Sequence, residues 1–592
     1  MQDGSQDIPR RDADPVMSAL QAAAAVPMPD VPFVHIESSG TILVYGRDQI
    51  AIEAGELLKE HLDVTVLIMP PAMIAVQGAT DFPVVKGKIA AATGHFGAFD
   101  LVIDDFAEPQ PGLRGASSYG PARNGAKSHC DIILDISGGS PLFSAADLRD
   151  GYLRVDPGNR SAVLDAVLKA QDLTGVFEKP RYVAFDASLC AHSRSNIVGC
   201  RRCLDLCPAG AIVPAGDHAA IDPNICAGCG QCAAACPTGA ASYAILPPDV
   251  LLRKLRAMLL AYRAAGSLHP VVLFHDEAHG TPILDVLAQS GNGLPAHVLP
   301  FAVNETTQIG LEGIAAGFAY GASAIRFLLR GRPRHDVSGL RQTVALAEPI
   351  LQGLGFTGPR IAMLEIDDPD MVGIALRQVP WMPSAPWPAS FQPTGGKREV
   401  LRFALRELHR AAPDPVEVIA LPKGAPFGAV EVDAGNCTLC LSCVSACPTG
   451  ALRDDPERPM LRFVEDACVQ CGLCEATCPE HVITLKPQID FRAATAPARV
   501  LKEEEPFCCI QCGKPFGVKS TIDRVVAKLE GRHWMYAASS RRVDLIKMCE
   551  DCRVAVVSEG HFDPYGAPDR AIRTTDDYLR EGDPTGKRGP RP

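Results

Sequence analysis

The sequence predicts a multidomain α/β protein in which two α/β domains with parallel sheets alternate with two small cysteine-rich modules, followed by a small C-terminal module. Three observations lead to this prediction. The 592 residues are enough for roughly three to five domains of ordinary size. Apolar runs of strand length alternate with stretches of helical spacing over most of the chain. The 22 cysteines gather in short groups, separated by long stretches that contain none.

The first α/β domain is expected at residues 37–180, after a disordered tail at residues 1–36. A β-α-β pattern opens it, in which the helical stretch DQIAIEAGELLKEHL lies between two strand-like runs. Cys130 lies at the edge of an expected strand and is assigned to the core. The expected strands of this domain are short apolar runs, namely TILVYG, DVTVLIM, FDLVIDD and CDIILDI.

The turn after TILVYG lacks the features of a dinucleotide site. Such a turn needs Gly-x-Gly-x-x-Gly directly after the first strand and an acidic residue at the end of the second. Gly46, Asp48 and Ala51 fill the three glycine positions, and the acidic position falls near Met69. Asp48 places bulk and negative charge where the backbone should approach a pyrophosphate. The pattern therefore indicates a degenerate Rossmann-like domain, and bound flavin is not expected.

The second α/β domain is expected at residues 246–428. Helical stretches lie between most of its expected strands, which favours a mostly parallel sheet. The apolar stretch LEGIAAGFAYGASAIRFLL carries two charged residues and is interpreted as a helix followed by a strand. The expected strands are PVVLFH, AHVLPFAV, ASAIRFLL and RIAMLEI.

Four charged or imidazole side chains near the first of these strands could bind a metal ion. His275 and His279 lie beside Asp276 and Glu277 in LFHDEAHG. No further ligand lies nearby in the sequence, so a solvated loop is the favoured interpretation.

The two cysteine-rich modules are expected at residues 181–245 and 429–490. Together they contain one pattern four times, and three copies read C-x2-C-x2-C-x3-C-P. In the fourth copy nine residues, not two, separate Cys190 from Cys200. An aspartate lies four residues before Cys190, as it does before Cys226 and Cys437. Cys190 is therefore assigned as a first ligand; a buried thiol beside a three-cysteine site, or His192 as a substitute ligand, are the alternatives.

This spacing is typical of iron–sulfur ligation, because four cysteine thiolates hold one [4Fe–4S] cubane. Both modules resemble bacterial dicluster ferredoxin domains, which are α+β folds with two clusters that transfer single electrons. In such paired modules the last cysteine of each run binds the other cluster. The resemblance implies four ligand sets: Cys190, Cys200, Cys203 and Cys236; Cys226, Cys229, Cys232 and Cys207; Cys437, Cys440, Cys443 and Cys478; Cys468, Cys471, Cys474 and Cys447.

Two looser resemblances concern the arrangement of domains. An α/β unit followed by RYVAFDASLC and a dicluster module resembles part of the heterodisulfide reductase A subunit, whose flavin-binding turn is damaged here. Residues 270–330 faintly resemble the small iron–sulfur subunit of the associated hydrogenase, but lack its cysteine site. The overall layout is similar to polyferredoxin-like proteins associated with bacterial formate dehydrogenases. The last resemblance implies a molybdoenzyme as redox partner.

A C-terminal module is expected at residues 506–560, between a linker at 491–505 and a tail at 561–592. Two C-x2-C pairs, separated by 36 residues, resemble a zinc ribbon in which four thiolates surround one ion. Zinc is the favoured metal, and a fifth iron–sulfur cluster or free thiols are the alternatives. Cys508 is the spare thiol. The proposed ligands are Cys509, Cys512, Cys549 and Cys552.

Composition restricts the classes of partner and the compartment. The chain has 69 acidic and 57 basic residues, so a nucleic-acid partner is not expected. It lacks an uncharged apolar run of about 20 residues, so no membrane span is expected. Asp12 and Asp14 follow Arg10 and Arg11 directly, which argues against an export signal. Cysteines in metal-ligand spacing rather than in a disulfide framework favour the reducing cytoplasm.

These observations predict an iron–sulfur electron-transfer protein with four [4Fe–4S] clusters. It would relay single electrons to or from a partner oxidoreductase, plausibly a formate dehydrogenase-type molybdoenzyme. No catalytic residue is predicted, and a non-catalytic subunit is favoured over an enzyme. Two alternatives stay open: a flavin-dependent redox enzyme subunit of the heterodisulfide reductase type, and a maturation or scaffold protein whose clusters are structural. Cluster potentials, and hence the direction of electron flow, do not follow from the sequence.

Overall fold

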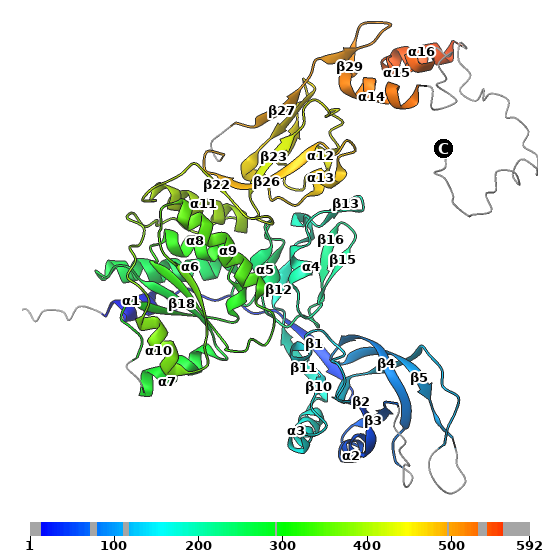
Figure 1. Ribbon diagram of the computed structural model, residues 1–592, viewed down its shortest axis with the longest axis vertical. Helices are drawn as coiled ribbons and strands as arrows, with labels where there is room; N and C mark the ends of the chain where they lie inside the picture. The colour runs from blue at the N-terminus through cyan, green and yellow to red at the C-terminus, as the bar shows by residue number, and fades with distance from the viewer. Residues whose placement is uncertain are drawn as a thin grey trace, which may run out of the picture. The chain divides into compact units, whose positions relative to one another are not determined.

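The computed structural model describes residues 14–70, 80–110, 118–290, 293–493, 497–530 and 542–559 (Figure 1). It is a mixed α/β structure with several sheets. The chain divides into two compact units, which are described separately. The first unit consists of Met1–Gly428, Cys468–Leu473 and Pro487–Ala494, and the second of Ala429–Ala467, Cys474–Lys486 and Thr495–Pro592.

The described part of the predicted N-terminal tail is folded. Helix α1 (Pro15–Ala24) begins after Asp14, whose carboxylate accepts a hydrogen bond from the backbone N–H of Val16 at 2.9 Å. It packs against α6 (Pro248–Ala264), and its Ala19 is fully buried there. Strand β1 (Phe33–Ser38) then pairs with β11 (Gly175–Pro180). The prediction of disorder was wrong here because a short apolar helical face finds its partner more than 200 residues away in the sequence.

The first α/β domain contains a seven-stranded sheet in the order β10-β9-β2-β3-β4-β5-β8. The strands from β10 to β4 are parallel, whereas β4, β5 and β8 are antiparallel. The expected all-parallel sheet is therefore only half correct, because β4 and β5 form a hairpin, which makes its two strands antiparallel. The strands are β2 (Thr41–Gly46), β3 (Asp63–Ile68), β4 (Val84–His95), β5 (Ala98–Ala107), β8 (Ala126–Cys130), β9 (Ile132–Ile136) and β10 (Tyr152–Arg154).

Two helices cover one face of this sheet. Helices α2 (Asp48–Leu58) and α3 (Arg160–Gln171) bury alanine, valine and leucine side chains against it. Gly46 at the end of β2 permits this packing, since a Cβ there would lie 2.9 Å from the Ala51 Cβ. Met69, at the position where a ribose-binding acid would be needed, accepts a hydrogen bond from the Tyr45 hydroxyl at 3.0 Å. Both positions are occupied by packing interactions within the domain. Cys130 is buried in the core, as predicted.

The second α/β domain has a four-stranded, wholly parallel sheet in the order β19-β18-β20-β21, as predicted. One face packs against α6, α8, α9 and α11, and the other against α7 and α10. The stretch considered as a membrane span forms α8 followed by β20. The elements are β18 (Val271–Asp276), α7 (Gly280–Ser290), β19 (Val298–Val303), α8 (Leu311–Ala319), β20 (Ala324–Leu329), α9 (Ser338–Gly353), β21 (Ile361–Glu365), α10 (Pro369–Arg377) and α11 (Lys397–Arg410).

The cysteine-rich modules are built from very short elements. In the first module each cysteine run ends in a five-residue helix, and the two halves are closed by the antiparallel pair β12–β17. The elements are β12 (Val183–Phe185), β13 (Ser193–Arg194), β14 (Ile197–Val198), α4 (Arg202–Leu206), β15 (Ile212–Ala215), β16 (His218–Ile221), α5 (Gln231–Ala235) and β17 (Ala241–Tyr243).

The second module repeats this design. Strand β27 (Arg499–Glu503) pairs with β25, so the predicted linker at 491–505 contains a strand. The other elements are β22 (Val418–Ala420), β23 (Gly428–Val432), α12 (Ser442–Ala446), β24 (Leu452–Asp454), β25 (Met460–Phe463), α13 (Leu473–Thr477) and β26 (Ile483–Asp490).

The C-terminal module begins with the hairpin of β28 (Pro506–Cys508) and β29 (Pro515–Val518). Helices α14 (Lys519–Leu529), α15 (Arg542–Ile546) and α16 (Glu550–Ser558) follow. The predicted tail at 561–592 lies outside the described residues. Within the described ranges, every helix is too short or too polar to cross a lipid bilayer.

Candidate functional site

The first predicted ligand set is brought together in the first unit. Burial, together with the nearby Cys200, Cys236 and Cys190, raises the pKa of the Cys203 thiol to about 12. Burial also raises the pKa of Cys200, to which Cys236 and Cys190 contribute. The last cysteine of one run therefore lies beside the first three of the other run.

The nine residues between Cys190 and Cys200 form a β-hairpin that brings these two cysteines together. Strands β13 and β14 pair antiparallel, and at their base the Cys200 N–H donates to the Ala191 carbonyl at 3.0 Å. His192 is buried, and its Nδ1 donates to the Cys200 carbonyl at 2.9 Å. The Ser193 N–H donates to the Asp217 carbonyl at 3.1 Å. The extra residues are thus a folded insertion that brings Cys190 close to Cys200, and the role of Cys190 as a first ligand stays a prediction.

The second predicted set shows the same crossing. Burial, together with the nearby Cys207 and Cys226, raises the pKa of Cys229 to about 12. Burial raises the pKa of Cys232 well above its usual value, and Cys229, Cys226 and Cys207 add to the shift. Cys207, from the other run, therefore lies with the three regularly spaced cysteines.

After three of the four Cys-Pro pairs, a backbone N–H turns back towards the cysteine sulfur. Cys207 Sγ accepts from the Ala211 N–H at 3.3 Å, and Cys236 Sγ accepts from the Ala241 N–H at 3.5 Å. Cys447 Sγ accepts from the Ala451 N–H at 3.2 Å. Hydrogen bonds to sulfur stabilise a thiolate, and they also tune a cluster bound to it. The repeated CPAGA and CPTGA sequences therefore have a role that spacing alone did not reveal.

The third predicted set lies within the second unit. Burial raises the pKa of Cys443 to about 12, and Cys437, Cys440 and Cys478 contribute to the shift. Lys502 of β27 donates to the backbone carbonyls of Cys437 and of Ala434, the latter at 2.9 Å.

The fourth predicted set has members in both compact units. Cys468 and Cys471 belong to the first unit, and Cys447 and Cys474 to the second. Cys468 is buried, and the Gln470 side-chain amide donates to its sulfur at 3.4 Å. The grouping of these four cysteines stays a prediction from the spacing.

The converging thiols fit an iron–sulfur cluster chemically. Burial disfavours a lone thiolate at most of these sites, and thiolates packed together would repel one another. Iron supplies the positive charge that lets four buried thiolates coexist, and cubane clusters in proteins are held by four such ligands.

Lys397 is a charged neighbour of the first set that the sequence analysis missed. Its ammonium donates to the carbonyls of Ala233 and Ala234, the latter at 2.7 Å, and it lies 3.4 Å from a Glu312 carboxylate oxygen. Burial raises the pKa of Cys236, but Lys397 and the Ala241 N–H lower it, and the net shift is downward. Lys397 lies more than 150 residues from this loop in the chain, so only the fold reveals the contact.

A groove of about 1040 Å³ lies next to the second set. Tyr182 lines it and covers Gly228, where a Cβ would lie 2.4 Å from the Tyr182 ring. Lys179 also lines it and donates to the Asn224 carbonyl at 2.8 Å, two residues before Cys226. The groove brings solvent-accessible surface close to these thiols.

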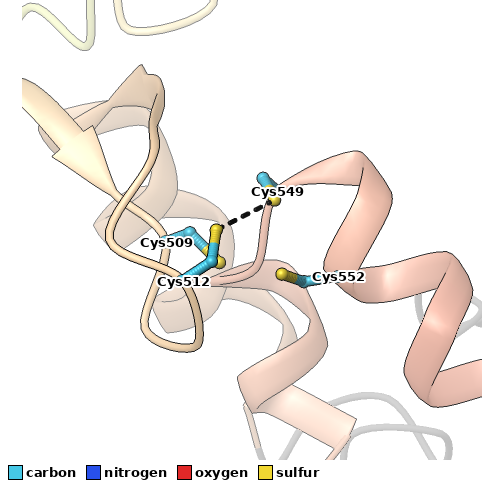
Figure 2. Close-up of side chains that lie close together, drawn as sticks. All are labelled: Cys509, Cys512, Cys549 and Cys552. Atoms are coloured by element: carbon cyan, nitrogen blue, oxygen red, sulfur yellow. Dashed lines mark hydrogen bonds between the residues drawn. The ribbon is translucent and has the colours of Figure 1, made fainter.

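The C-terminal cysteines form a much tighter group (Figure 2). One sulfur from each of Cys509, Cys512, Cys549 and Cys552 lies within 4.8 Å of all the others. Cys512 Sγ and Cys549 Sγ are 3.6 Å apart. A tetrahedral zinc ion with Zn–S bonds of about 2.3 Å requires sulfurs roughly 3.8 Å apart, so the group has the size of a single-ion site. Cys508 is exposed and lies outside the group.

The histidines of LFHDEAHG do not lie in a solvated loop, contrary to expectation. His275 and His279 are both buried, and His279 Nε2 lies 2.9 Å from an Asp367 carboxylate oxygen. Asp276 accepts a hydrogen bond from the His279 N–H. These contacts hold the start of α7 against the carboxyl ends of β18 and β21. Among the described residues, they are not part of any tight group of metal-ligand atoms.

Comparison with known proteins agrees with the cysteine pattern. Residues 170–240 and residues 436–483 each match a 4Fe-4S dicluster domain. A stretch of 89 residues is 35% identical to the thiosulfate reductase electron transfer subunit PhsB of Salmonella typhi. This match covers 14% of the chain and 45% of that protein, so the chain spans less than half of the curated relative it matches. The two domain matches support an iron–sulfur protein of the ferredoxin type.

Proposed function

We propose that the chain carries four [4Fe–4S] clusters and relays single electrons to or from a partner oxidoreductase. The observation that carries this proposal is the crossing of the cysteine runs. Cys236 lies with the first three cysteines of the other run, and Cys207 and Cys478 do the same in their sets. Crossed ligation holds two clusters close together within one module, as one-electron transfer requires.

The α/β domains act in this proposal as supports and docking surfaces. Asp48 at the second glycine position and Met69 in place of a ribose-binding acid support a structural role for the first domain rather than nucleotide or flavin binding. The groove beside Cys226 gives a partner protein access to the second ligand set. The chain is then a non-catalytic subunit that depends on another protein for substrate chemistry.

The proposed partner is a molybdoenzyme of the formate dehydrogenase type, in the cytoplasm. The domain layout supports this choice, and the similarity to an electron transfer subunit of a reductase supports an oxidoreductase partner more generally. The cysteines form sets of metal-ligand spacing, which suits a compartment where thiols stay reduced.

Iron analysis of the anaerobically reconstituted protein tests the proposal. We expect about 16 iron atoms per chain, four for each cubane, and a broad visible absorption that bleaches with dithionite. About eight iron atoms, or a colourless protein that contains only zinc, would contradict the proposal.

The partner is tested separately. The tagged full-length protein, purified under argon from its native host, should retain a molybdenum-containing enzyme. Formate should then bleach the clusters in the purified complex but not in the isolated chain. Full iron loading together with no response to formate in the complex would reject this partner while leaving the relay intact.

We also propose that the C-terminal group binds one zinc ion. The Cys512→Ser and Cys552→Ser variants should each lose about one zinc per chain and keep their full iron content. Loss of iron and of visible absorption in these variants would instead indicate a fifth cluster at this site.

A further inference from the structure

Within the first unit, the loop of the first ligand set touches the segment Cys468–Leu473. Arg202 lies between Cys200 and Cys203, and its guanidinium donates to the Val469 carbonyl at 3.3 Å. The same group donates to the carbonyls of Gly424 and Ala425, at 3.1 and 3.2 Å. Val469 directly follows Cys468. One side chain therefore joins the backbone beside two cysteines of the first module to the backbone beside a cysteine of the second.

The base of the inserted hairpin makes the second contact with this segment. Gly199 precedes Cys200, and a Cβ on it would lie 2.5 Å from Leu473 Cγ. Leu473 is fully buried and lies between Cys471 and Cys474 in the sequence. The Leu473 side chain thus packs directly on the Gly199 backbone, at a distance that leaves no room for a Cβ.

The start of α11 makes the third contact. Lys397 donates to carbonyls between Cys232 and Cys236 in the first module. The next residue, Arg398, donates to the Cys468 carbonyl and, at 2.9 Å, to the Pro426 carbonyl. Its guanidinium also lies 4.7 Å from the centre of the Phe427 ring. Two consecutive side chains of one helix therefore hold the cysteine loops of both modules.

The cationic side chains at this contact would reduce the repulsion between two negatively charged clusters. Two clusters with thiolate ligands are both negatively charged, and their repulsion grows as the distance between them falls. Arg202, Lys397 and Arg398 place three cationic side chains around the contact between the loops, and Lys397 is shared with the Glu312 carboxylate at 3.4 Å. The arrangement favours a short distance between the loops that hold Cys200 and Cys468.

We propose that electrons pass between the two modules at this contact, which we call the electron joint. Arg202 and Arg398 would hold the loop of Cys200 and Cys203 close to the loop of Cys468 and Cys471, so that clusters bound to these loops would exchange single electrons directly. One reduced cluster gives up one electron, the other accepts it, and no bond or proton is transferred. This inference rests on the proposed four-cluster relay.

Substitution of Arg202 provides the main test. The Arg202→Met variant removes the bridging charge and its hydrogen bonds but keeps a long side chain. Arg201→Met is the matched control, since Arg201 is exposed and pairs only locally with Asp205 at 3.2 Å. Gly199→Val is an independent variant that forces the hairpin away from Leu473.

Three quantities are measured on each reconstituted full-length protein: iron per chain, electron transfer between modules after rapid one-electron reduction, and magnetic interaction between reduced clusters by electron paramagnetic resonance. Arg202→Met and Gly199→Val should keep about 16 iron atoms. They should slow transfer between the modules and weaken the interaction, whereas Arg201→Met should behave as the unaltered protein. Unchanged transfer and interaction in both variants would overturn the joint.

If these variants lose iron, the joint can still be tested in proteins whose contact between the two cysteine loops is unaltered. Cys203→Ser and Cys471→Ser alter the spectra of the first and fourth clusters and so identify their signals. The reduced, unaltered protein should show interaction between these two signals. Full iron loading without that interaction would reject the joint but leave the proposed function standing, whereas about eight iron atoms would reject both.

Discussion

The backbone conformation around the first two cysteines differs between the regular cysteine runs and the irregular one. In the regular runs, the residue before the second cysteine and the residue after it are left-handed, as at Gly228 and Gly230 with φ of 78° and 76°. In the irregular run the residue after the second cysteine, Arg201, has φ of −122°. There the left-handed residues are Ser195 and Asn196, at the tip of the inserted hairpin. Lengthening the loop has moved the strained positions away from the ligands.

The regular run Cys437–Cys447 shows what the short loop costs. Its left-handed positions are occupied by Leu439 and Leu441, with φ of 51° and 57°. For residues with a Cβ this conformation costs roughly 1–2 kcal/mol each. Here the left-handed residues flank the second cysteine, whereas at Cys190 the extra residues form a hairpin held by backbone hydrogen bonds.

The largest effect is expected when the first ligand of the irregular run is removed. If Cys190 is a true first ligand, Cys190→Ala should lower the iron content by about four atoms per chain. Cys130→Ala is the control, because Cys130 is equally buried but lies in the core of the first domain. Iron analysis and the visible spectrum measure the difference. An unchanged iron content in Cys190→Ala would make this cysteine a bystander and the irregular run a three-cysteine site.

A second prediction concerns the charges beside the two modules. Lys397 lies beside Cys236, and removal of a positive charge disfavours the more negative, reduced state of a cluster. Lys397→Met should therefore lower the reduction potential of the first cluster by roughly 60 mV, a tenfold change in a one-electron equilibrium. Lys502→Met should do the same for the third cluster, because Lys502 donates to the Cys437 carbonyl. Redox titration followed by electron paramagnetic resonance assigns each shift.

Arg406→Met is the control for these two variants, since Arg406 lies over the Phe403 ring on α11. If Lys397→Met and Lys502→Met keep the reduction potentials of the unaltered protein, as Arg406→Met should, these lysines only support packing.

A third prediction converts the irregular run into a regular one. Replacing residues 191–199 by Ala-Gly, the sequence between Cys226 and Cys229, should leave the iron content unchanged, because two residues suffice in the regular runs. It removes the Gly199 contact with Leu473, so transfer between the modules should slow. Iron analysis and transfer kinetics separate the two effects. Loss of a whole cluster would show that the hairpin is required for ligation itself.

The smallest expected effect tests the strain in the regular run. Leu441→Gly removes the cost of a left-handed residue with a Cβ, worth about 1 kcal/mol. If the strain is released when the cluster leaves, iron loss to a chelator should be about fivefold slower. Gly228→Ala introduces the opposite change and a clash with the Tyr182 ring, so it should lose iron faster. If both variants lose iron to the chelator at the rate of the unaltered protein, the left-handed positions carry no strain.

Local patterns predicted the elements well, but not their distant partners. The β-α-β unit at Thr41–Ile68 and the parallel strands β18 to β21 were predicted because each is a short apolar run with its own periodicity. The β4–β5 hairpin and helix α1 were missed, since the direction of a strand and the burial of a weakly apolar helix depend on remote contacts. His279 was placed in solvent because its partner Asp367 lies 88 residues away.

The site was predicted in the same uneven way. Spacing identified the cysteines, because ligands of one cluster are mostly neighbours in the sequence. The charged residues around them were missed, because Lys397 and Arg398 come from a helix of the second α/β domain. Their long-range contacts leave no periodic or motif signal.

The hairpin at Cys190 also has a consequence for how the protein survives oxygen. Its strands and the bond between Cys200 and Ala191 do not need metal, so a bleached first module keeps Cys190 and Cys200 in place. The left-handed residues Leu439 and Leu441 cost free energy that a bound metal would offset, so we expect their loop to relax when metal is lost. After oxidative damage, iron should therefore return to the first module before the second.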